Sequence, residues 1–303
     1  MVVFVTSEEL FNLAEIYTFY ASILSLILGI FGNMFVILIF GNLPIFRNRP
    51  CSFYLTIETI ANIVLLLAIY SSRIVAFRFG QDPVHIFLYW CKIRTILTQI
   101  CCLSSLAIVS LAAIDQYFST NYHVFIRKFS TIKTAHRTSR ILLLLSIIHS
   151  IPFFIFYEIR SPLGCLAYNS IFVKYQSMFY YPILLASIPL AISITFSLLA
   201  YRNVRRIIRR QIPIVRRRLD RQLAAIVLAR VGCLVVLGIP YVIYSLFELH
   251  IQFNENDQYA LAIKHCIEAI ILSLFYANYA VTFVFVEKIE SLGFRFRLIF
   301  MFI

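Results

Sequence analysis

Seven long apolar stretches constrain this sequence more than any other feature. A helix needs about 20 predominantly apolar residues to cross the hydrocarbon core of a bilayer. Hydrophobic residues make up 61% of the chain and charged residues only 14%, so the chain is more apolar than an ordinary soluble domain. We therefore predict an all-α membrane protein, a single domain over 1–303 built as a seven-transmembrane helix bundle. Its spans are expected at roughly 18–41, 53–76, 92–117, 140–158, 179–201, 222–247 and 262–286.

The positions of Lys and Arg predict the orientation of this bundle. Cytoplasmic loops carry an excess of these residues, and most of the 27 in this chain lie in the segments on one side of the predicted spans. The amino terminus is therefore predicted outside. Because Glu8, Glu9 and Glu15 precede the first span in place of a basic region, we expect an uncleaved span and not a signal peptide. The basic segments are 41–52, 118–140, 202–221 and the tail after 286.

The net charge of +13 does not indicate a nucleic-acid-binding protein. Its densest basic segment, 201–221, lies between two predicted spans, where the excess of positive charge on the inner side and attraction to anionic lipid account for it. The tail 288–303 mixes Phe and Leu with Arg295 and Arg297, which suits a short amphipathic helix on the inner face. We expect an interaction with anionic membrane lipid and no nucleic-acid partner.

Two of the seven cysteines, Cys91 and Cys165, fall in segments predicted to lie outside. An oxidising exterior permits a disulfide between them, and two free thiols are the alternative. No group of residues has the spacing of a metal site or of a catalytic nucleophile. We therefore expect neither an enzyme nor a metal site, and no cofactor.

Short motifs follow one another in a characteristic order along the predicted spans. The first span holds Gly32-Asn33, the third begins with Trp90-Cys91 and ends with Asp115-Gln116-Tyr117, the fifth holds Pro189, the sixth Pro240 and the seventh Asn278-Tyr279. In this order and at this depth the motifs resemble those of rhodopsin-like (class A) G-protein-coupled receptors. The resemblance implies a plasma-membrane receptor that binds an extracellular ligand and signals through a heterotrimeric G protein by outward movement of its sixth helix. It also implies the Cys91–Cys165 disulfide.

The chain departs from the family pattern in the switch triplet at the end of the third span. Gln116 replaces the central arginine, which in the family pairs with the neighbouring aspartate at rest. Glutamine offers two donors and no charge, so it cannot form an ion pair with Asp115 or with Asp220 at the foot of the sixth span. Ion pairs near a surface are often worth only about 0–1 kcal/mol, so the loss need not abolish folding or coupling.

Three further departures lie deeper in the spans. Asn62 replaces the aspartate that binds sodium in most family members, so we expect no sodium site. The sixth span has no aromatic toggle residue before Pro240, and Tyr279 follows Asn278 where the family has proline.

The resemblance also narrows the ligand. Thr98 stands where amine receptors carry aspartate and Leu272 where opsins carry the retinal lysine, which leaves a peptide or a small chemosensory molecule. Charges within a span are costly, so Arg94 and Glu268 are expected to face the bundle cavity. A ligand contact, a mutual Arg94–Glu268 pair and snorkelling to the interface are the alternatives. The residues predicted to bind the ligand are Arg94, Thr98, Gln99, Tyr244 and Glu268.

Two other charges lie deep in the spans. Glu58 lies one helical turn from Asn62, and Arg230 lies about three turns into the sixth span. Each would be expensive there without a partner, so we hypothesise a buried ion pair that holds the sixth helix inward at rest. The alternative is that Arg230 snorkels while Glu58 is protonated or bonds to polar neighbours. The residues predicted to act in switching are Asp115, Gln116, Tyr117, Glu58, Arg230, Asn62, Asn278 and Pro240.

Basic residues at the inner ends of the fifth and sixth spans recur at steps of three and four, which places them on one helical face. The resemblance assigns this face to the G protein, and a solvated face against lipid headgroups is the alternative. The residues expected to face the G protein are Arg205, Arg206, Arg209, Arg217 and Asp220.

Two other functions are alternatives to a signalling receptor. A receptor-like decoy or scaffold would bind ligand without activating a G protein, and the missing arginine at position 116 favours it. A small transporter would use the buried charges as relay groups, but such proteins usually contain internal repeats, and none is visible in this sequence.

Overall fold

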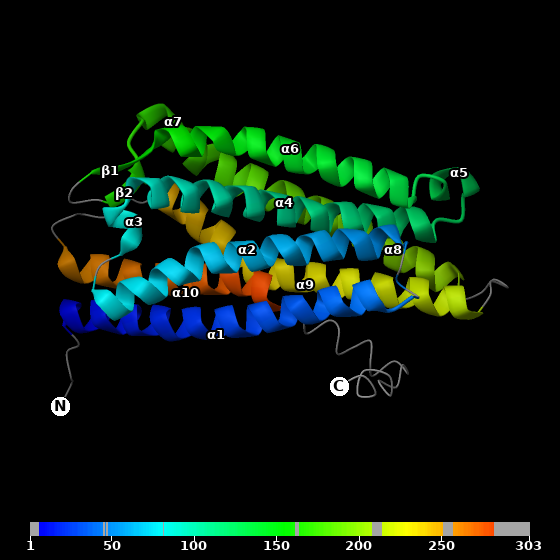
Figure 1. The fold of residues 1–303 in the computed structure, drawn as a ribbon, viewed down its shortest axis with the longest axis horizontal. Helices are drawn as coiled ribbons and strands as arrows, with labels where there is room; N and C mark the ends of the chain where they lie inside the picture. Colours follow the sequence, from blue (N-terminus) through cyan, green and yellow to red (C-terminus); the bar gives the residue numbers. More distant parts are fainter. Residues whose placement is uncertain are drawn as a thin grey trace.

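The computed structural model describes residues 6–281 except 45, 47, 81, 161–163, 208–213 and 251–256, and it leaves the helical side chains within 206–221 and 248–250 undescribed. Long helices lie side by side along one direction (Figure 1). They are α1 (Ser7–Asn42), α2 (Pro50–Phe79), α4 (Leu88–Thr120), α6 (Ile132–Phe156), α8 (Ile188–Ile207), α9 (Ile214–His250) and α10 (Gln258–Ala280).

Seven helices in the described part of the chain are long and apolar enough to cross a membrane, which confirms the predicted architecture. The fifth of these spans begins earlier than expected, because α7 (Ser170–Tyr175) and a π-helix, η1 (Gln176–Ser187), continue directly into α8. The predicted tail helix at 288–303 and the last residues of the seventh expected span lie outside the described residues.

The first helix also starts earlier than predicted, at Ser7, because a capping box satisfies its first amide groups. Thr6 Oγ1 accepts a hydrogen bond from the Glu9 amide at 3.3 Å, and Glu9 Oε2 accepts one from the Thr6 amide at 2.8 Å. The apolar pattern alone predicts that the helix starts at the edge of the hydrocarbon core. The capping box allows α1 to start earlier in the chain, before that apolar stretch.

One end of the bundle, which we call the disulfide end, carries a hairpin that the sequence did not predict. β1 (Tyr157–Arg160) pairs antiparallel with β2 (Gly164–Ala167), and the short α3 (Pro83–Ile86) lies beside the hairpin (Figure 1). The fourth span therefore ends at Phe156 and not at the expected 158.

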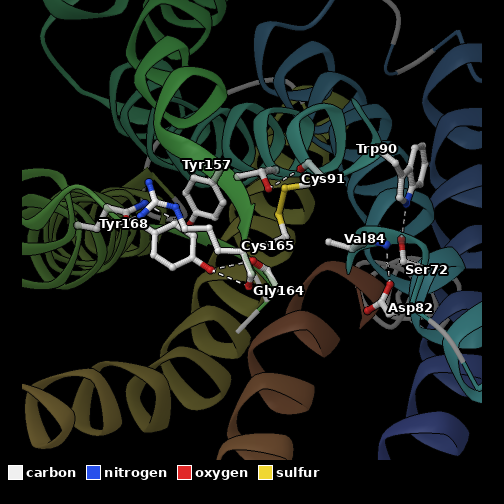
Figure 2. Close-up of a disulfide and its surroundings, with 12 residues drawn as sticks. Ser72, Asp82, Val84, Trp90, Cys91, Tyr157, Gly164, Cys165 and Tyr168 are labelled. Carbon is white, nitrogen blue, oxygen red and sulfur yellow. Dashed lines mark hydrogen bonds between the residues drawn. A yellow bond between two sulfur atoms is a disulfide. The ribbon is translucent and has the colours of Figure 1, made fainter. Parts of the chain in front are cut away.

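A disulfide joins this hairpin to the start of α4, as Figure 2 shows. The Cα atoms of Cys91 and Cys165 lie 5.9 Å apart, which confirms the expected bridge. Beside it, Trp90 Nε1 donates to Ser72 Oγ at 3.0 Å and holds α4 against α2. Gly164 has φ of 78°, and a Cβ there would lie 2.6 Å from the His85 ring, so this turn requires glycine.

The opposite end, which we call the α5 end, carries the short α5 (Val124–Arg127) between α4 and α6 (Figure 1). The centre of the bundle is α4, which packs against α2, α6, α8 and α9. Its residues Val109, Ala112 and Ala113 are fully buried. One face of α4 near the α5 end therefore lies inside the bundle.

Prolines interrupt three of the spans. Pro152 lies inside α6, Pro182 inside η1 and Pro240 inside α9, and each lacks the amide donor of a regular helix. α10 contains no proline, because Tyr279 follows Asn278, and it continues as a regular helix to Ala280.

α1, α2 and α10 approach one another closely at Gly29. A Cβ added to Gly29 would lie 2.4 Å from Leu66 Cδ1 and 3.3 Å from the Cα of Ala280. The Leu66 side chain can rotate away, but the α10 backbone cannot move without shifting the helix.

We predict that Gly29→Ala lowers the free energy of unfolding by about 1–3 kcal/mol, the usual cost of overpacking a tight core. Gly41→Ala is the matched control on the same helix, because no atom lies within 4 Å of a Cβ there, and it should leave stability unchanged or slightly raised. Unfolding of both purified variants in the same detergent measures the difference, and equal stability would contradict the prediction.

Candidate functional site

Three buried side chains join α2, α9 and α10 in the middle of the bundle. Arg230 Nε donates to Glu58 Oε1 at 2.6 Å, and Arg230 Nη1 donates to Asn278 Oδ1. The side chains of Arg230 and Glu58 are 1% and 0% exposed. The structure thus brings together the two charges that the sequence hypothesis pairs, and it adds Asn278 as a third partner. We call Glu58, Arg230 and Asn278 the central cluster.

The burial of the central cluster determines its energetic role. A buried ion pair contributes little net stability, but removing one partner typically costs about 3–5 kcal/mol because the other charge stays buried. Within the described residues, Glu58 Oε2, Arg230 Nη2 and Asn278 Nδ2 have no hydrogen-bond partner. The cluster is therefore only partly satisfied, and it is easier to open than a saturated network.

Two buried amide side chains, Asn62 and Asn33, connect α2 to α1 near the central cluster. Asn62, one turn from Glu58 on α2, accepts a hydrogen bond from Ser105 Oγ at 2.7 Å and donates to Asn33 Oδ1 at 3.4 Å. Asn33 Nδ2 in turn donates to the carbonyl of Tyr279 at 3.0 Å. These contacts are neutral, and they hold α1, α2, α4 and α10 together at the depth of the ion pair.

The predicted switch triplet lies at the α5 end of α4 and is largely buried. Asp115 is 7% exposed and Gln116 only 1%, while the ring of Tyr117 packs against Phe196 on α8 with centroids 5.5 Å apart. Ser130, in the segment between α5 and α6, donates from Oγ to Asp115 Oδ1 at 2.8 Å. A serine hydroxyl from the neighbouring loop thus binds the carboxylate, which in the family pairs with arginine.

A polar cavity of about 480 Å³ lies beside Asp115 at the α5 end. Asp115 is the one carboxylate among its described lining residues, whereas Arg49, Arg127 and Lys128 contribute three cations. Within the part of the chain that the structure describes, no ion pair or side-chain hydrogen bond involves these three cations. The cavity therefore carries an excess of positive charge.

A second cavity, of about 550 Å³, lies at the disulfide end between α1, α2 and α10. Phe19 and Phe77 stack at 3.9 Å on its wall. Of the five residues predicted to bind ligand, Glu268 lines this cavity. The other charged or titratable residues that line it are Glu15, Arg73, Asp82 and His265.

The remaining predicted ligand residues are distributed over α4 and α9. Gln99 Oε1 accepts a hydrogen bond from Tyr180 OH at 2.6 Å, so a contact inside the bundle already engages it. Arg94 is half-buried and lies within electrostatic range of Arg73, Asp82 and Tyr276. Thr98 is half-buried and Tyr244 is buried.

Gly238 stands where the family has its aromatic toggle residue, and it lines a void of about 20 Å³ next to Leu106, Pro189 and Phe275. Pro240, two residues further along α9, has no amide N–H and therefore interrupts the backbone hydrogen bonds of the helix. Tyr241 then stacks on Phe275 of α10 with ring centroids 4.4 Å apart. An aromatic contact between α9 and α10 therefore exists, one helical position beyond the proline.

Of the residues expected to face the G protein, Arg205 lies exposed near the end of α8, with Cζ 4.7 Å from the centroid of the Tyr201 ring. The side chains of Arg206, Arg209, Arg217 and Asp220 lie outside the described residues. The basic face remains a prediction.

Three features of the site were not predicted from the sequence. These are the Ser130 contact to Asp115, the link from Asn278 to Arg230, and the place of Arg73 in the wall of the disulfide-end cavity. For the Ser130 contact the sequence did contain a signal. No arginine stands beside Asp115, so its carboxylate needs another hydrogen-bond donor. Among the described residues, no group of His, Cys, Asp and Glu could hold a metal ion.

We predict that Arg230→Met lowers the free energy of unfolding by about 3–5 kcal/mol, because Glu58 would stay buried without its partner. Arg160→Met is the matched control, since it breaks an exposed pair with Glu158 at 3.1 Å, and it should cost less than about 1 kcal/mol. The double variant Glu58→Leu/Arg230→Met should recover most of the loss. Unfolding of the purified variants in mixed micelles measures these effects, and equal losses for the two single variants would contradict them.

Residues 32–281 match the family model of the 7 transmembrane receptor (rhodopsin family). Comparison with curated proteins finds no match. The matched segment contains the disulfide, the central cluster, the α4 triplet and most of the residues that line both cavities. Members of this family are multi-pass plasma-membrane receptors that respond to extracellular ligands through G proteins, and they are not enzymes. The chain belongs to the rhodopsin family of seven-transmembrane receptors.

Proposed function

We propose that this receptor binds its ligand at the disulfide end, outside the cell, and activates a heterotrimeric G protein at the α5 end by outward movement of α9. The observation that carries the proposal is the Arg230–Glu58 contact of 2.6 Å, which ties α9 to α2 in the middle of the bundle. α9 cannot move outward while this contact is intact.

The charge pattern supports this orientation. The segments 41–52, 118–140 and 202–221 hold most of the Lys and Arg residues. Each of them joins two long helices whose adjoining ends lie at the α5 end of the bundle (Figure 1). Cytoplasmic loops carry such an excess of basic residues. Arg205 and the basic residues that follow it in the sequence would lie at the inner membrane surface, where they meet the G protein and anionic lipid headgroups. The amino terminus would lie outside.

The central cluster would act as the resting lock of the receptor. Arg230 has partners on both α2 and α10, so a small rotation or shift of either helix lengthens one of its two contacts. A ligand that favours such a shift stabilises the state in which α9 is released, in proportion to its preference for that state. The switch then depends on a buried pair and does not require an arginine at position 116.

The ligand is proposed to be a peptide or a small chemosensory molecule, and not a biogenic amine or retinal. Thr98 and Leu272 lack the acid and the amine that those two classes use in this family. The disulfide-end cavity offers carboxylates, a guanidinium and two aromatic rings, a mixture suited to a ligand with both polar and apolar groups.

A decoy receptor is the second candidate, and the burial of Gln116 favours it. An uncharged side chain that is 1% exposed offers the G protein no arginine at the centre of its docking site. Under this proposal the receptor binds ligand and keeps α9 closed.

We predict that Glu58→Gln raises basal G-protein activation, because it removes the negative charge that holds Arg230. A loss of only about 1.4 kcal/mol from the resting state would shift the ratio of states tenfold. Cells expressing matched surface amounts of each variant give the measurement. Glu158→Gln, which alters an exposed pair of similar chemistry, is the control and should leave basal activation unchanged. Unchanged activation in Glu58→Gln as well would exclude the lock.

We predict that the unaltered chain activates G protein detectably and that Gln116→Arg changes this activity by less than Glu58→Gln does. The physical reason is that Gln116→Arg adds a charge next to the Asp115 carboxylate, whereas Glu58→Gln leaves the buried Arg230 charge without its counter-ion, at a cost of about 3–5 kcal/mol. The same cell assay compares the three proteins. Silence of the unaltered chain that Gln116→Arg relieves would favour the decoy function instead.

A further inference from the structure

Two arginines lie near the disulfide-end cavity, and neither has an acidic partner among the described residues. Arg73 stands six residues before the last residue of α2, Phe79, and Arg94 stands six residues after the first residue of α4, Leu88. The two charges are within electrostatic range of each other. Within the part of the chain that the structure describes, no ion pair or hydrogen bond engages either guanidinium, and Arg94 Nε is buried without a partner.

The groups around the two arginines compensate their charge only in part. Arg73 Cζ lies 5.9 Å from the centroid of the Tyr276 ring, and Arg94 is within electrostatic range of the same ring. An aromatic face attracts a cation but cannot accept hydrogen bonds as an oxygen does. Asp82 is within range of Arg94, but its Oδ1 already accepts a hydrogen bond from the Val84 amide at 2.9 Å. Two half-buried positive charges therefore lack a counter-ion.

Negative charge reaches the same cavity from other helices. Glu15 of α1 and Glu268 of α10 line it, whereas Arg73 lines it from α2. Glu15 is exposed, and no ion pair or side-chain hydrogen bond involves it within the described residues. The cavity thus carries positive charge on its α2 side and negative charge on its α1 and α10 sides.

An apolar surface adjoins the positive side of the cavity. Phe77 follows Arg73 by four residues on α2, so both side chains lie on one face of the helix. The ring of Phe77 stacks on Phe19 of α1 with centroids 3.9 Å apart, and both rings line the cavity. A volume of about 550 Å³ lies within the range of sites for small molecules.

We propose that the ligand is a small zwitterion with an apolar side chain, as amino acids and short peptides are. Its carboxylate binds Arg73 close to the charge of Arg94, because a guanidinium fork matches the geometry of a carboxylate. Its ammonium group binds Glu15, and its apolar part lies against Phe19 and Phe77. This inference rests on the proposed function, because it takes the disulfide-end cavity as the ligand site.

The opposite charges of the cavity make the site selective. A site built to pair with a charged ligand group rejects an analogue without it, because the protein group is then desolvated and left unpaired. A ligand that carries only the carboxylate leaves Glu15 without a partner, and one that carries only the ammonium group leaves Arg73 without one. Both single-charge analogues are therefore expected to bind more weakly than the zwitterion.

The test measures thermal unfolding of the full-length receptor in phosphatidylcholine nanodiscs during titration with four probes. L-phenylalanine and glycyl-L-phenylalanine are the zwitterions, L-phenylalaninamide lacks the carboxylate, and 3-phenylpropionate lacks the ammonium group. We expect at least one zwitterion to raise Tm with a Kd about tenfold or more below those of the two analogues.

Variants of the charged residues assign the contacts. Arg73→Gln should raise the Kd of the zwitterion about tenfold or more, and Glu15→Gln should raise it several-fold because Glu15 is exposed. Arg94→Gln should raise the Tm of the ligand-free receptor, because it removes a charge that has no partner. Arg78→Gln is the matched control on α2, since Arg78 is exposed and does not line the cavity, and it should change neither Kd nor Tm.

Three results would overturn the proposal. They are the absence of a Tm shift with either zwitterion, equal Kd values for the zwitterions and the analogues, and a lower ligand-free Tm in Arg94→Gln, which would show a structural role. A parallel sample in detergent micelles without phospholipid tests a lipid phosphate as the partner of the arginines. A fall in Tm in those micelles that Arg73→Gln abolishes, with no effect of the probes, would also overturn it.

None of these measurements involves a G protein, so this inference and the proposed function can fail separately. Binding of a zwitterion by a receptor that stays silent in cells would support the inference and count against signalling. Raised basal activation in Glu58→Gln without zwitterion binding would overturn the inference and leave the signalling function standing.

Discussion

Charge buried in a bundle that lipid surrounds cannot be hydrated from outside, so it needs a partner within the protein. Glu58 and Arg230 meet this requirement together, and the positions of α2 and α9 follow from their contact. Asn278 extends the same constraint to α10. The neutral amides of Asn33 and Asn62 then bring in α1 and α4 without adding charge. The middle layer of the bundle is arranged around one ion pair.

At the end of α4, Gln116 is 1% exposed and cannot form an ion pair with Asp115 as an arginine would. In the middle of the bundle, removing one partner of the buried Arg230–Glu58 pair costs about 3–5 kcal/mol. Under the proposed function, the charge contact that controls α9 is therefore Arg230–Glu58 and not a pair within the α4 triplet. Asp115 keeps a partner, but that partner is the hydroxyl of Ser130 in the segment between α5 and α6.

The parts of the fold that depend on composition could be predicted from the sequence, and the parts that depend on side-chain direction could not. The number of spans follows from the lengths of the apolar stretches. The contact between Glu58 and Arg230 follows from the free-energy cost of burying either charge without a partner. The β1–β2 hairpin and the η1 π-helix carry no periodic signal that separates them from loop or regular helix. The engagement of Gln99 by Tyr180 depends on how α4 and η1 rotate, which spacing along one helix does not fix.

The regularity of α10 has a mechanical consequence. A helix of 23 residues without a proline behaves as a stiff rod, and at 1.5 Å per residue it is about 35 Å long. Tilting such a rod by about 5° about one end displaces the other end by about 3 Å, a distance comparable with the length of a hydrogen bond. Asn278 lies near one end of this rod and Glu268 about midway along it. A modest displacement of α10 near the disulfide-end cavity is therefore geometrically amplified where α10 meets Arg230, with no bend to absorb it.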